Sequence, residues 1–309
     1  MDTLHGVDGS LRSAILGALD SLLSALELEP VKLEPAGTHT FRARNESERF
    51  TRIFGGQSIA QAVIAASATV PEGGLHSLHA YFVHPGDNHQ TLDLKVDAVR
   101  DGRSMATRQV SVSQSGRPLL VAMTSFGTVS TTPHSPAPAP TVPAPEELPL
   151  LQDWARDAPP EAAPNALGWV HTPPPLEIRI GEAPYFLGGA RAHGPRSHWM
   201  RLPRSVGEDP VLHTALLAYA TDYFLLDMAL RSYPLPVPLT SLVAVSLDHA
   251  VWLHRPVRFD RWHVHTQDLV TISGERALIR GTIHDEDGHH VASTTQEALI
   301  RVPGQESRR

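Results

Sequence analysis

Two stretches of this 309-residue chain follow the same order of elements, about 170 residues apart. In each, a helical pattern comes first, and about four strand-like runs separated by turn residues come after it. Short matches mark the offset: His79-Ala80 corresponds to His249-Ala250, and Val121-Ala122 corresponds to Val291-Ala292. Each match is short, so the common order of the matches carries the argument. This pattern predicts an internal duplication, in which the chain folds as two copies of one unit.

Each copy is predicted to hold one long helix. The first helix is expected from Gly56 to Ala68, and Pro71 follows it. The second begins at Asp209-Pro210, a good N-cap and first-turn pair, and is expected to run to about Arg231. Hairpin turn signals such as Asp101-Gly102 separate the strand-like runs, which predicts antiparallel pairing. We therefore predict an α+β fold of two repeats, each with a long helix wrapped by an antiparallel β-sheet.

The strand-like runs and the linker between the repeats set the expected domain boundaries. A stretch rich in proline and alanine from Thr131 to Pro149 cannot build a core, and prolines stay frequent beyond it. We expect an N-terminal repeat with a leading helix over residues 1–130, a linker rich in proline and alanine over 131–172, and a C-terminal repeat that carries the catalytic residues over 173–309. The expected strands are Ser77 to Val83, Thr91 to Val99, Met105 to Ser113, Pro118 to Thr128, Leu242 to Trp252, Trp262 to Ile272, Arg276 to His284 and Val291 to Val302.

Composition excludes several classes of function. The net charge of −7 leaves no basic surplus to neutralise phosphates, so we expect no nucleic-acid partner. No apolar run approaches the roughly 20 residues that cross a bilayer, and the first residues do not form a secretory signal, so we expect no membrane association and a cytoplasmic location. The chain has no cysteine, which suits a reducing compartment. Its 18 histidines lack the spacing of a zinc-binding helix, and we expect neither a metal nor a cofactor.

Asp222 is the first candidate for chemistry. Its neighbours at helical spacing are almost all apolar, and an aspartate on such a face is costly unless it is hydrogen-bonded or used. It can satisfy a nearby backbone group, or it can act as a general base toward a water molecule. Asp227 lies just over one turn further on, on a different face, and periodicity alone does not choose between the two.

Two strand-like runs offer further polar groups. In the run Ser246-Leu247-Asp248-His249, strand alternation directs Ser246 and Asp248 to one face and the other two residues to the opposite face. The serine hydroxyl could hold a water that Asp222 activates. Gln296 ends the polar run that begins at Ser293, and its amide could orient the same water or satisfy a neighbouring strand. Taken one at a time, each of these residues is better explained by a structural role.

Other catalytic patterns are poorly supported. The run from Gly56 to Ala60 has Ser58 in a nucleophile-elbow position but lacks the second glycine, and the surrounding pattern is antiparallel. The chain also contains no glycine-rich phosphate loop of the common types, which argues against nucleoside triphosphates and nicotinamide cofactors.

Taken together, the motifs resemble those of the acyl-CoA thioesterase II family, the double-hotdog thioesterases. The resemblance spans most of the chain from Leu22 to Val302, apart from the linker. Two differences stand out: Ser246 replaces a more usual threonine, and His84 stands where arginine is favoured. The motifs that carry the resemblance, in chain order, are Phe54-Gly55-Gly56-Gln57, Gln61-Ala62, His76-Ser77, His79, Tyr81-Phe82, Pro85-Gly86-Asp87, Arg100-Asp101-Gly102, Ala218-Tyr219-Ala220-Thr221-Asp222, Asp248-His249, Trp252, His254-Arg255-Pro256, Asp287-Gly288, Val291-Ala292-Ser293 and Gln296-Glu297.

The resemblance implies an acyl-CoA hydrolase of lipid metabolism that releases a free fatty acid and CoA. It implies a catalytic set of Asp222, Ser246 and Gln296 around one water, and a homo-oligomer. Gly55, Gly56 and Gln57 are the candidate substrate-binding residues, because glycine at a helix start permits close approach of backbone N–H groups to a developing oxyanion. Phe126 stands where Gln296 does in the other repeat, so we expect one working site per chain. The alternatives are a hotdog-fold enoyl-CoA hydratase and a non-catalytic acyl-CoA-binding protein.

Overall fold

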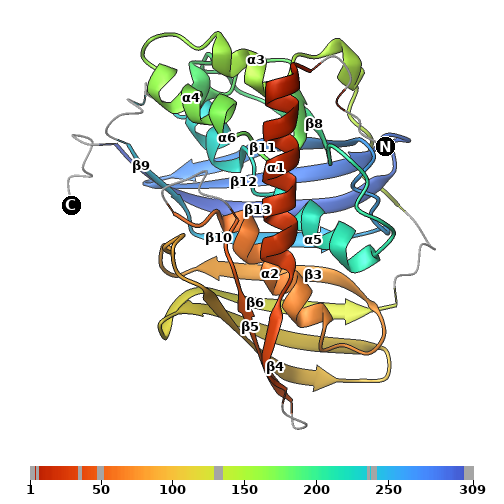
Figure 1. Ribbon diagram of the computed structural model, residues 1–309. Helices are drawn as coiled ribbons and strands as arrows, with labels where there is room; N and C mark the ends of the chain where they lie inside the picture. Colours follow the sequence, from red (N-terminus) through yellow and green to blue (C-terminus); the bar gives the residue numbers. More distant parts are fainter. Residues whose placement is uncertain are drawn as a thin grey trace.

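The strands of both repeats form one antiparallel sheet, and the helices cover one of its faces (Figure 1). This computed structural model describes residues 4, 7–33, 37–46, 52–128, 135–234, 237 and 242–302. The order across the sheet is β1 (Glu29–Leu33), β2 (Thr38–Ala43), β4 (Leu92–Asp101), β5 (Met105–Gln114), β6 (Arg117–Gly127), β3 (Gly74–Phe82), β10 (Asp248–Leu253), β13 (His290–Arg301), β12 (Arg276–Asp285), β11 (His263–Ser273), β8 (Arg196–Arg201) and β7 (Glu177–Ile180). A further strand, β9 (Val243–Ser246), pairs with β13.

The two repeats join where β3 pairs with β10. In that register His249 lies opposite Ala80, and Ala250 lies opposite His79, so the matched dipeptides meet at the centre of the sheet. Their side chains differ in direction, however: His79 is exposed and packs its ring against Trp252, whereas His249 is fully buried on the helix side. The duplication therefore holds for the elements and their order, while this particular match joins residues on opposite faces.

Two helices, one from each repeat, form the centre of the core. Helices α2 (Gly55–Ser67) and α5 (Pro210–Ala220) pack against each other, and their buried apolar residues belong to one cluster with those of the sheet. A Cβ atom on Gly56 would lie 2.3 Å from the Tyr219 carbonyl oxygen, so only glycine allows this close approach. The long helix α1 (Gly9–Leu26) crosses in front of α2 (Figure 1). This arrangement confirms the predicted fold class, a double hotdog in which each repeat wraps its sheet around a helix.

The second core helix is shorter than predicted. We expected it to continue to about Arg231, but α5 ends at Ala220 and a separate helix, α6 (Leu225–Arg231), begins after a turn. The Thr221 N–H caps α5 by donating to the Leu217 carbonyl at 3.0 Å, and Phe224 adopts a left-handed conformation with φ of 65°. Neither proline nor glycine marks this break, so no local sequence pattern indicates it. Asp222 therefore lies in a turn rather than in the middle of a helix.

Part of the predicted linker is folded. Two short helices, α3 (Leu151–Arg156) and α4 (Ala163–His171), lie within it, and a 3-10 turn, η1 (Pro145–Glu147), precedes them. They pack against each other, and α4 also contacts α1 and a second 3-10 turn, η2 (Tyr185–Leu187). Among the helices of the described ranges, none is both long enough and apolar enough to span a bilayer.

Candidate active site

The Asp222 carboxylate lies between the end of α5 and the start of α2. It is half-buried, and the Gly56 backbone N–H donates to its Oδ2 atom at 2.9 Å. A Cβ atom on Gly55 would lie only 2.7 Å from the same oxygen, so the carboxylate occupies space that a side chain at position 55 would fill. The first repeat thus supplies the helix start, and the second repeat supplies the acid.

The surroundings of Asp222 raise its pKa to about 7. Burial is the main cause, because it penalises the charged form, while hydrogen bonds from the Gly56 N–H and the Gln296 side chain lower the pKa in part. A carboxylic acid with a pKa near neutrality can exist in either form at physiological pH. Such a group is suited to accepting a proton in one step and returning it in the next.

A β-bulge brings Ser246 into the site. On β13 the partner of Ser246 is Ala298 and the partner of Ala250 is Thr295, so one strand advances four residues while the other advances three. The extra residue shifts the alternation of side chains between β9 and β10. As a result the Ser246 hydroxyl accepts a hydrogen bond of 2.8 Å from the Gln296 amide.

The same bulge turns His249 toward Gln296, contrary to the predicted strand alternation. His249 Nδ1 lies 2.7 Å from Gln296 Oε1, and His249 Nε2 lies 2.8 Å from the Thr221 hydroxyl. Burial lowers the pKa of His249 to about 4, so the ring is neutral at physiological pH. Strand alternation assigned this residue to the opposite face from Ser246. To place His249 correctly from the sequence, one would have had to predict the bulge. The dipeptide Asp248-His249 was, however, part of the family resemblance.

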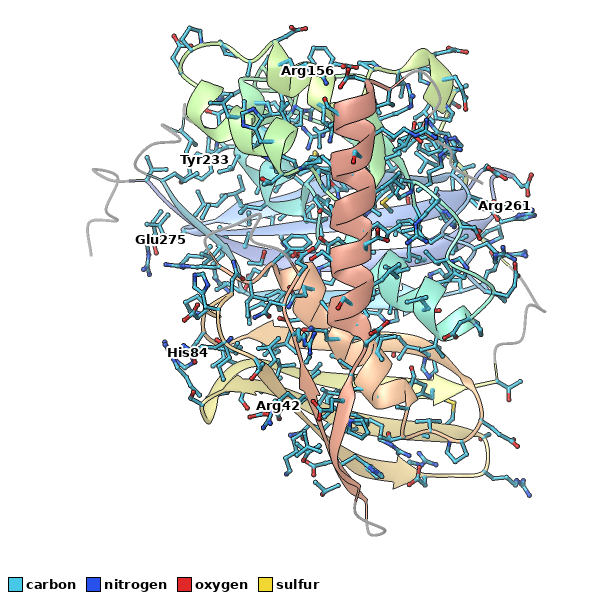
Figure 2. The ribbon with its side chains drawn as sticks, in the orientation of Figure 1. Arg42, His84, Arg156, Tyr233, Arg261 and Glu275 are labelled. Carbon is cyan, nitrogen blue, oxygen red and sulfur yellow. The ribbon has the colours of Figure 1, made fainter. Side chains whose placement is uncertain are left out.

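A pocket of about 470 Å³ opens onto Asp222 and Ser246. Gly55 and Ser58 also line it, as do exposed Arg52 and His84. His84 lies just beyond the end of β3, and its Nδ1 is 2.8 Å from the Pro118 carbonyl (Figure 2). The walls are mostly apolar and include Ile53, Phe82, Leu119, Leu226, Val245 and Leu247. A polar end and an apolar wall fit a ligand with a reactive group on an apolar chain.

Two candidate residues from the sequence, Gln57 and Asp227, do not line the pocket. The Gln57 side chain is buried and bonds to Asn45 at 2.8 Å and to the Glu46 N–H at 3.1 Å, and it is not among the residues that line the pocket. Asp227 is buried too; its carboxylate accepts two backbone N–H groups of η2 and lies 2.8 Å from Arg196. These contacts give Asp227 a structural role, which leaves Asp222 as the acid that faces the pocket.

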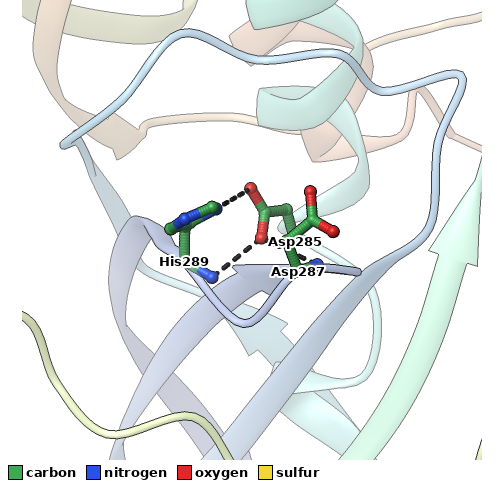
Figure 3. Close-up of side chains that lie close together, drawn as sticks. All are labelled: Asp285, Asp287 and His289. Carbon is green, nitrogen blue, oxygen red and sulfur yellow. Dashed lines mark hydrogen bonds and ion pairs between the residues drawn. The ribbon is translucent and has the colours of Figure 1, made fainter.

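A second cluster of polar side chains lies at the hairpin between β12 and β13 (Figure 3). Asp285, Asp287 and His289 place one potential ligand atom each within 4.8 Å of the others. Asp285 accepts the backbone N–H groups of Asp287 and His289 at 3.1 and 2.8 Å, and its second oxygen contacts the His289 ring. These bonds are typical of a carboxylate that closes a turn, and the group lies largely in solvent.

Fold and site together define a class: a two-repeat hotdog protein with an acid and a hydroxyl in the wall of an apolar pocket and a buried amide that bonds to both. Comparison with known families matches residues 46–127 to the acyl-CoA thioesterase N-terminal domain and residues 145–300 to the acyl-CoA thioesterase C-terminal domain. The chain belongs to the acyl-CoA thioesterase family. Both matched domains occur in the expected order.

Individual relatives agree with this assignment. Human acyl-coenzyme A thioesterase 8 is 32% identical over 93% of this chain and 92% of its own length. Acyl-CoA thioesterase 2 of Haemophilus influenzae is 29% identical over 88% of this chain and 95% of its own length. The crystal structure of an acyl-CoA thioesterase II from Mycobacterium marinum has a TM-score of 0.71 and 29% identity, covering 93% of this chain and 99% of that one.

Proposed function

We propose that this acyl-CoA thioesterase hydrolyses its substrate with a water molecule activated by Asp222. The observation that carries the proposal is that Asp222 and Ser246 line the polar end of the pocket, while the buried amide of Gln296 bonds to both of them from behind. The hydroxyl and the carboxylate can hold one water between them, the carboxylate can take a proton from it, and the amide can fix the positions of both groups. No cysteine exists in the chain to act as a nucleophile, and Ser58 lies within α2 rather than at a nucleophile elbow.

In the first step, ionised Asp222 takes a proton from the water as its oxygen attacks the thioester carbonyl carbon. The carbonyl oxygen becomes negative, and N–H groups at the start of α2 are suited to stabilise it, because the first turn of a helix has N–H groups without helical partners. The Gly56 N–H already donates to Asp222, which leaves that of Gly55, a residue that lines the pocket, as the better candidate. When the carbon–sulfur bond breaks, protonated Asp222 returns its proton to the thiolate, giving a free fatty acid and CoA.

The pocket also fits the two ends of an acyl-CoA. Its apolar wall suits an acyl chain, whereas Arg52 and His84 are placed where a cation can meet the phosphates of CoA. Arg52 is the stronger candidate for this contact, because a guanidinium group can donate two parallel hydrogen bonds to a phosphate. Location in the cytoplasm, assembly into a homo-oligomer and a place in fatty acid metabolism belong to the same proposal, and light scattering of the purified protein would measure the assembly.

The Asp222→Asn substitution tests the proposal most directly. Asparagine can still accept the Gly56 N–H but cannot take a proton, so turnover should fall by about 10²- to 10⁴-fold, the usual contribution of a general base. In the wild type, kcat should decrease as the pH falls below about 7, because the base becomes protonated. The measurement is release of free thiol from a panel of acyl-CoAs, since only a thioesterase liberates CoA.

Asp248→Asn is the matched control. Asp248 begins β10 close to the site, but its carboxylate accepts the Glu297 N–H at 2.7 Å, a bond that asparagine can keep, so turnover should be unchanged. Wild-type turnover in Asp222→Asn would rule out the base. Absence of thiol release from the wild type on every substrate would favour the non-catalytic binding protein, and hydration of an enoyl-CoA would favour the hydratase. The geometry disfavours the hydratase, because both ring nitrogens of His249 are bonded inside the protein.

A further inference from the structure

We infer that His249 and Thr221 are positioning residues, which fix the orientation of the Gln296 amide so that its NH₂ group faces Asp222 and Ser246. The inference rests on the proposed function, because it concerns how the base and its water are held. Thr221 and His249 do not line the pocket. Both have no exposed surface, and the same holds for Gln296.

The argument starts from the two ways in which an amide can be placed. One end of the Gln296 side chain faces His249 Nδ1 at 2.7 Å, and the other faces Ser246 Oγ at 2.8 Å. With the nitrogen toward Ser246, its two N–H groups can serve the hydroxyl and the Asp222 carboxylate. With the oxygen there instead, an ionised carboxylate would face another acceptor and lose a donor. Catalysis by ionised Asp222 therefore requires the first orientation.

His249 can enforce that orientation because it is neutral. A neutral imidazole has one N–H, and the other nitrogen is an acceptor. When the proton is on Nδ1, the ring donates to Gln296 Oε1 and holds the oxygen away from the carboxylate. When the proton is on Nε2, Nδ1 becomes an acceptor and draws the NH₂ group toward the ring. The tautomer of His249 thus selects the orientation of Gln296.

Thr221 can select the tautomer. Its hydroxyl lies 2.8 Å from His249 Nε2, and a proton donated to that nitrogen leaves the ring proton on Nδ1. The hydroxyl has a second possible acceptor, the Ala218 carbonyl at 2.7 Å, so this link is weaker than the one between His249 and Gln296. The donors then run in one direction, from Thr221 through His249 and Gln296 to the catalytic carboxylate. The turn after α5 and the bulge before β10 bring them into line.

The surroundings contain few groups that would disturb this order. The causes that set the pKa of Asp222 are burial, the Gly56 N–H and the Gln296 side chain, and no charged side chain is among them. His265 is the ionisable group that interacts electrostatically with His249, and burial lowers its pKa to about 3, so it is neutral as well. Its Nε2 atom is 3.2 Å from the Thr294 hydroxyl. Proton donation along the chain is therefore set by hydrogen bonds.

The experiment compares His249→Leu with His249→Asn. Asparagine places an N–H donor near the position of Nδ1, whereas leucine offers none. In His249→Leu, kcat should fall by about tenfold to a hundredfold with little change in KM, as expected for a misplaced catalytic group. The acidic limb of the kcat profile should move to higher pH, because Asp222 loses the donor that lowers its pKa. His249→Asn should restore most of the kcat and keep the limb in place.

Thr221→Val and Thr221→Ser provide a second pair if His249→Leu does not fold. Valine removes the hydroxyl at nearly constant volume and should cause a smaller shift in the same direction, whereas serine should resemble the wild type. Folded His249→Leu and Thr221→Val variants with wild-type kcat and pH profiles would overturn the inference. Equal losses in His249→Leu and His249→Asn without a pH shift would also overturn it, because packing alone would then explain them. An active Asp222→Asn variant would instead overturn the proposed function.

Discussion

The two repeats differ in the second residue after the end of each core helix and in the contacts that this residue makes. Two residues after the end of α2 the chain has Thr69, and two residues after the end of α5 it has Asp222. The Thr69 hydroxyl accepts a 2.9 Å hydrogen bond from Arg108, whose buried guanidinium also binds the Thr69 carbonyl and Asp101. Among the described residues, the groups that donate to Asp222 are a backbone N–H and an amide. Arg108 thus covers the end of α2, whereas Asp222 after α5 lines the pocket.

The strands show the same contrast. Thr124 on β6 and Thr294 on β13 are both buried, and they lie opposite Arg108 and Gly281 respectively. In the first repeat, the Arg108 side chain extends to Thr69, just after the end of α2. In the repeat with glycine, His265 approaches so closely that a Cβ atom on Gly281 would lie 2.3 Å from its ring.

Two residues further along each strand, the first repeat has Phe126 and the second has Gln296, both buried. Phenylalanine has no group that can hold a water, whereas the amide of Gln296 connects Ser246 with His249. The proposed chemistry therefore depends on a few polar replacements in an otherwise apolar core. In the proposed mechanism the first repeat contributes backbone N–H groups to the reaction, and its side chains in the pocket, such as Arg52, contribute to binding.

The largest effect on this contrast should come from Gln296→Leu, which gives the second repeat an apolar residue where the first has one. Loss of the amide removes a donor to Asp222 and to the Ser246 hydroxyl, so kcat should fall by about 10²-fold, similar to the loss of one aligned donor in other hydrolases. Steady-state kinetics on one acyl-CoA would measure it. Glu297→Gln is the control, because that neighbour bonds to surface Arg276, and its kcat should not change. A similar fall in both variants would mean that the amide has no special role.

An intermediate effect should appear in the pH dependence of stability. The folded pKa of Asp222 is raised from 3.8 to about 7, so the folded state retains a proton that the unfolded chain loses, and stability decreases as the pH rises through this range. Relative to Asp222→Asn, the wild type should lose about 2–4 kcal/mol of unfolding free energy between pH 4.5 and pH 8. Urea unfolding of both proteins at several pH values would show this difference. A constant difference across the range would contradict the raised pKa.

The smallest effect is expected from Arg108→Met in the first repeat. Methionine keeps most of the volume but leaves the Thr69 carbonyl without its donor, so the free energy of unfolding should decrease by about 2 kcal/mol. The kcat should stay at the wild-type value, because this end of α2 takes no part in the reaction. Thermal unfolding and thiol release would be measured on the same preparation. A large loss of kcat in a folded variant would mean that the C-terminal end of α2 affects the reaction.

Sequence patterns predicted the elements well where the local rule was strong. Turn residues such as Gly102 and Gly274 separated the strands, and Asp209-Pro210 marked the start of α5, where the Asp209 side chain accepts the Val211 N–H at 2.9 Å. The end of α5 escaped prediction because a backbone cap at Thr221 and the left-handed conformation of Phe224 close it. Ordinary helix-ending residues are absent there, and only the tertiary structure reveals the turn.

Only part of the candidate site could be predicted from the sequence, because the directions of its side chains depend on the tertiary structure. The apolar neighbours of Asp222 marked it as a carboxylate in need of a partner, and the family resemblance supplied Ser246 and Gln296. His249 was assigned to the wrong face because one inserted residue reverses the alternation between β9 and β10. Gln57 was assigned to the substrate because of its position beside two glycines, but its side chain points back to Asn45. Sequence spacing records neither a bulge nor the rotation of a helix about its axis.

The pairing of β3 with β10 has a consequence for how such a protein can evolve. If two identical chains met at this seam, every substitution would fall on both copies, and a residue needed at one helix end would have to be tolerated at the other. Covalent linkage removes that restriction, because Thr69 and Asp222 are specified by separate codons. The first repeat can then keep a stabilising residue at Thr69 while its Gly56 N–H still donates to Asp222 of the second repeat.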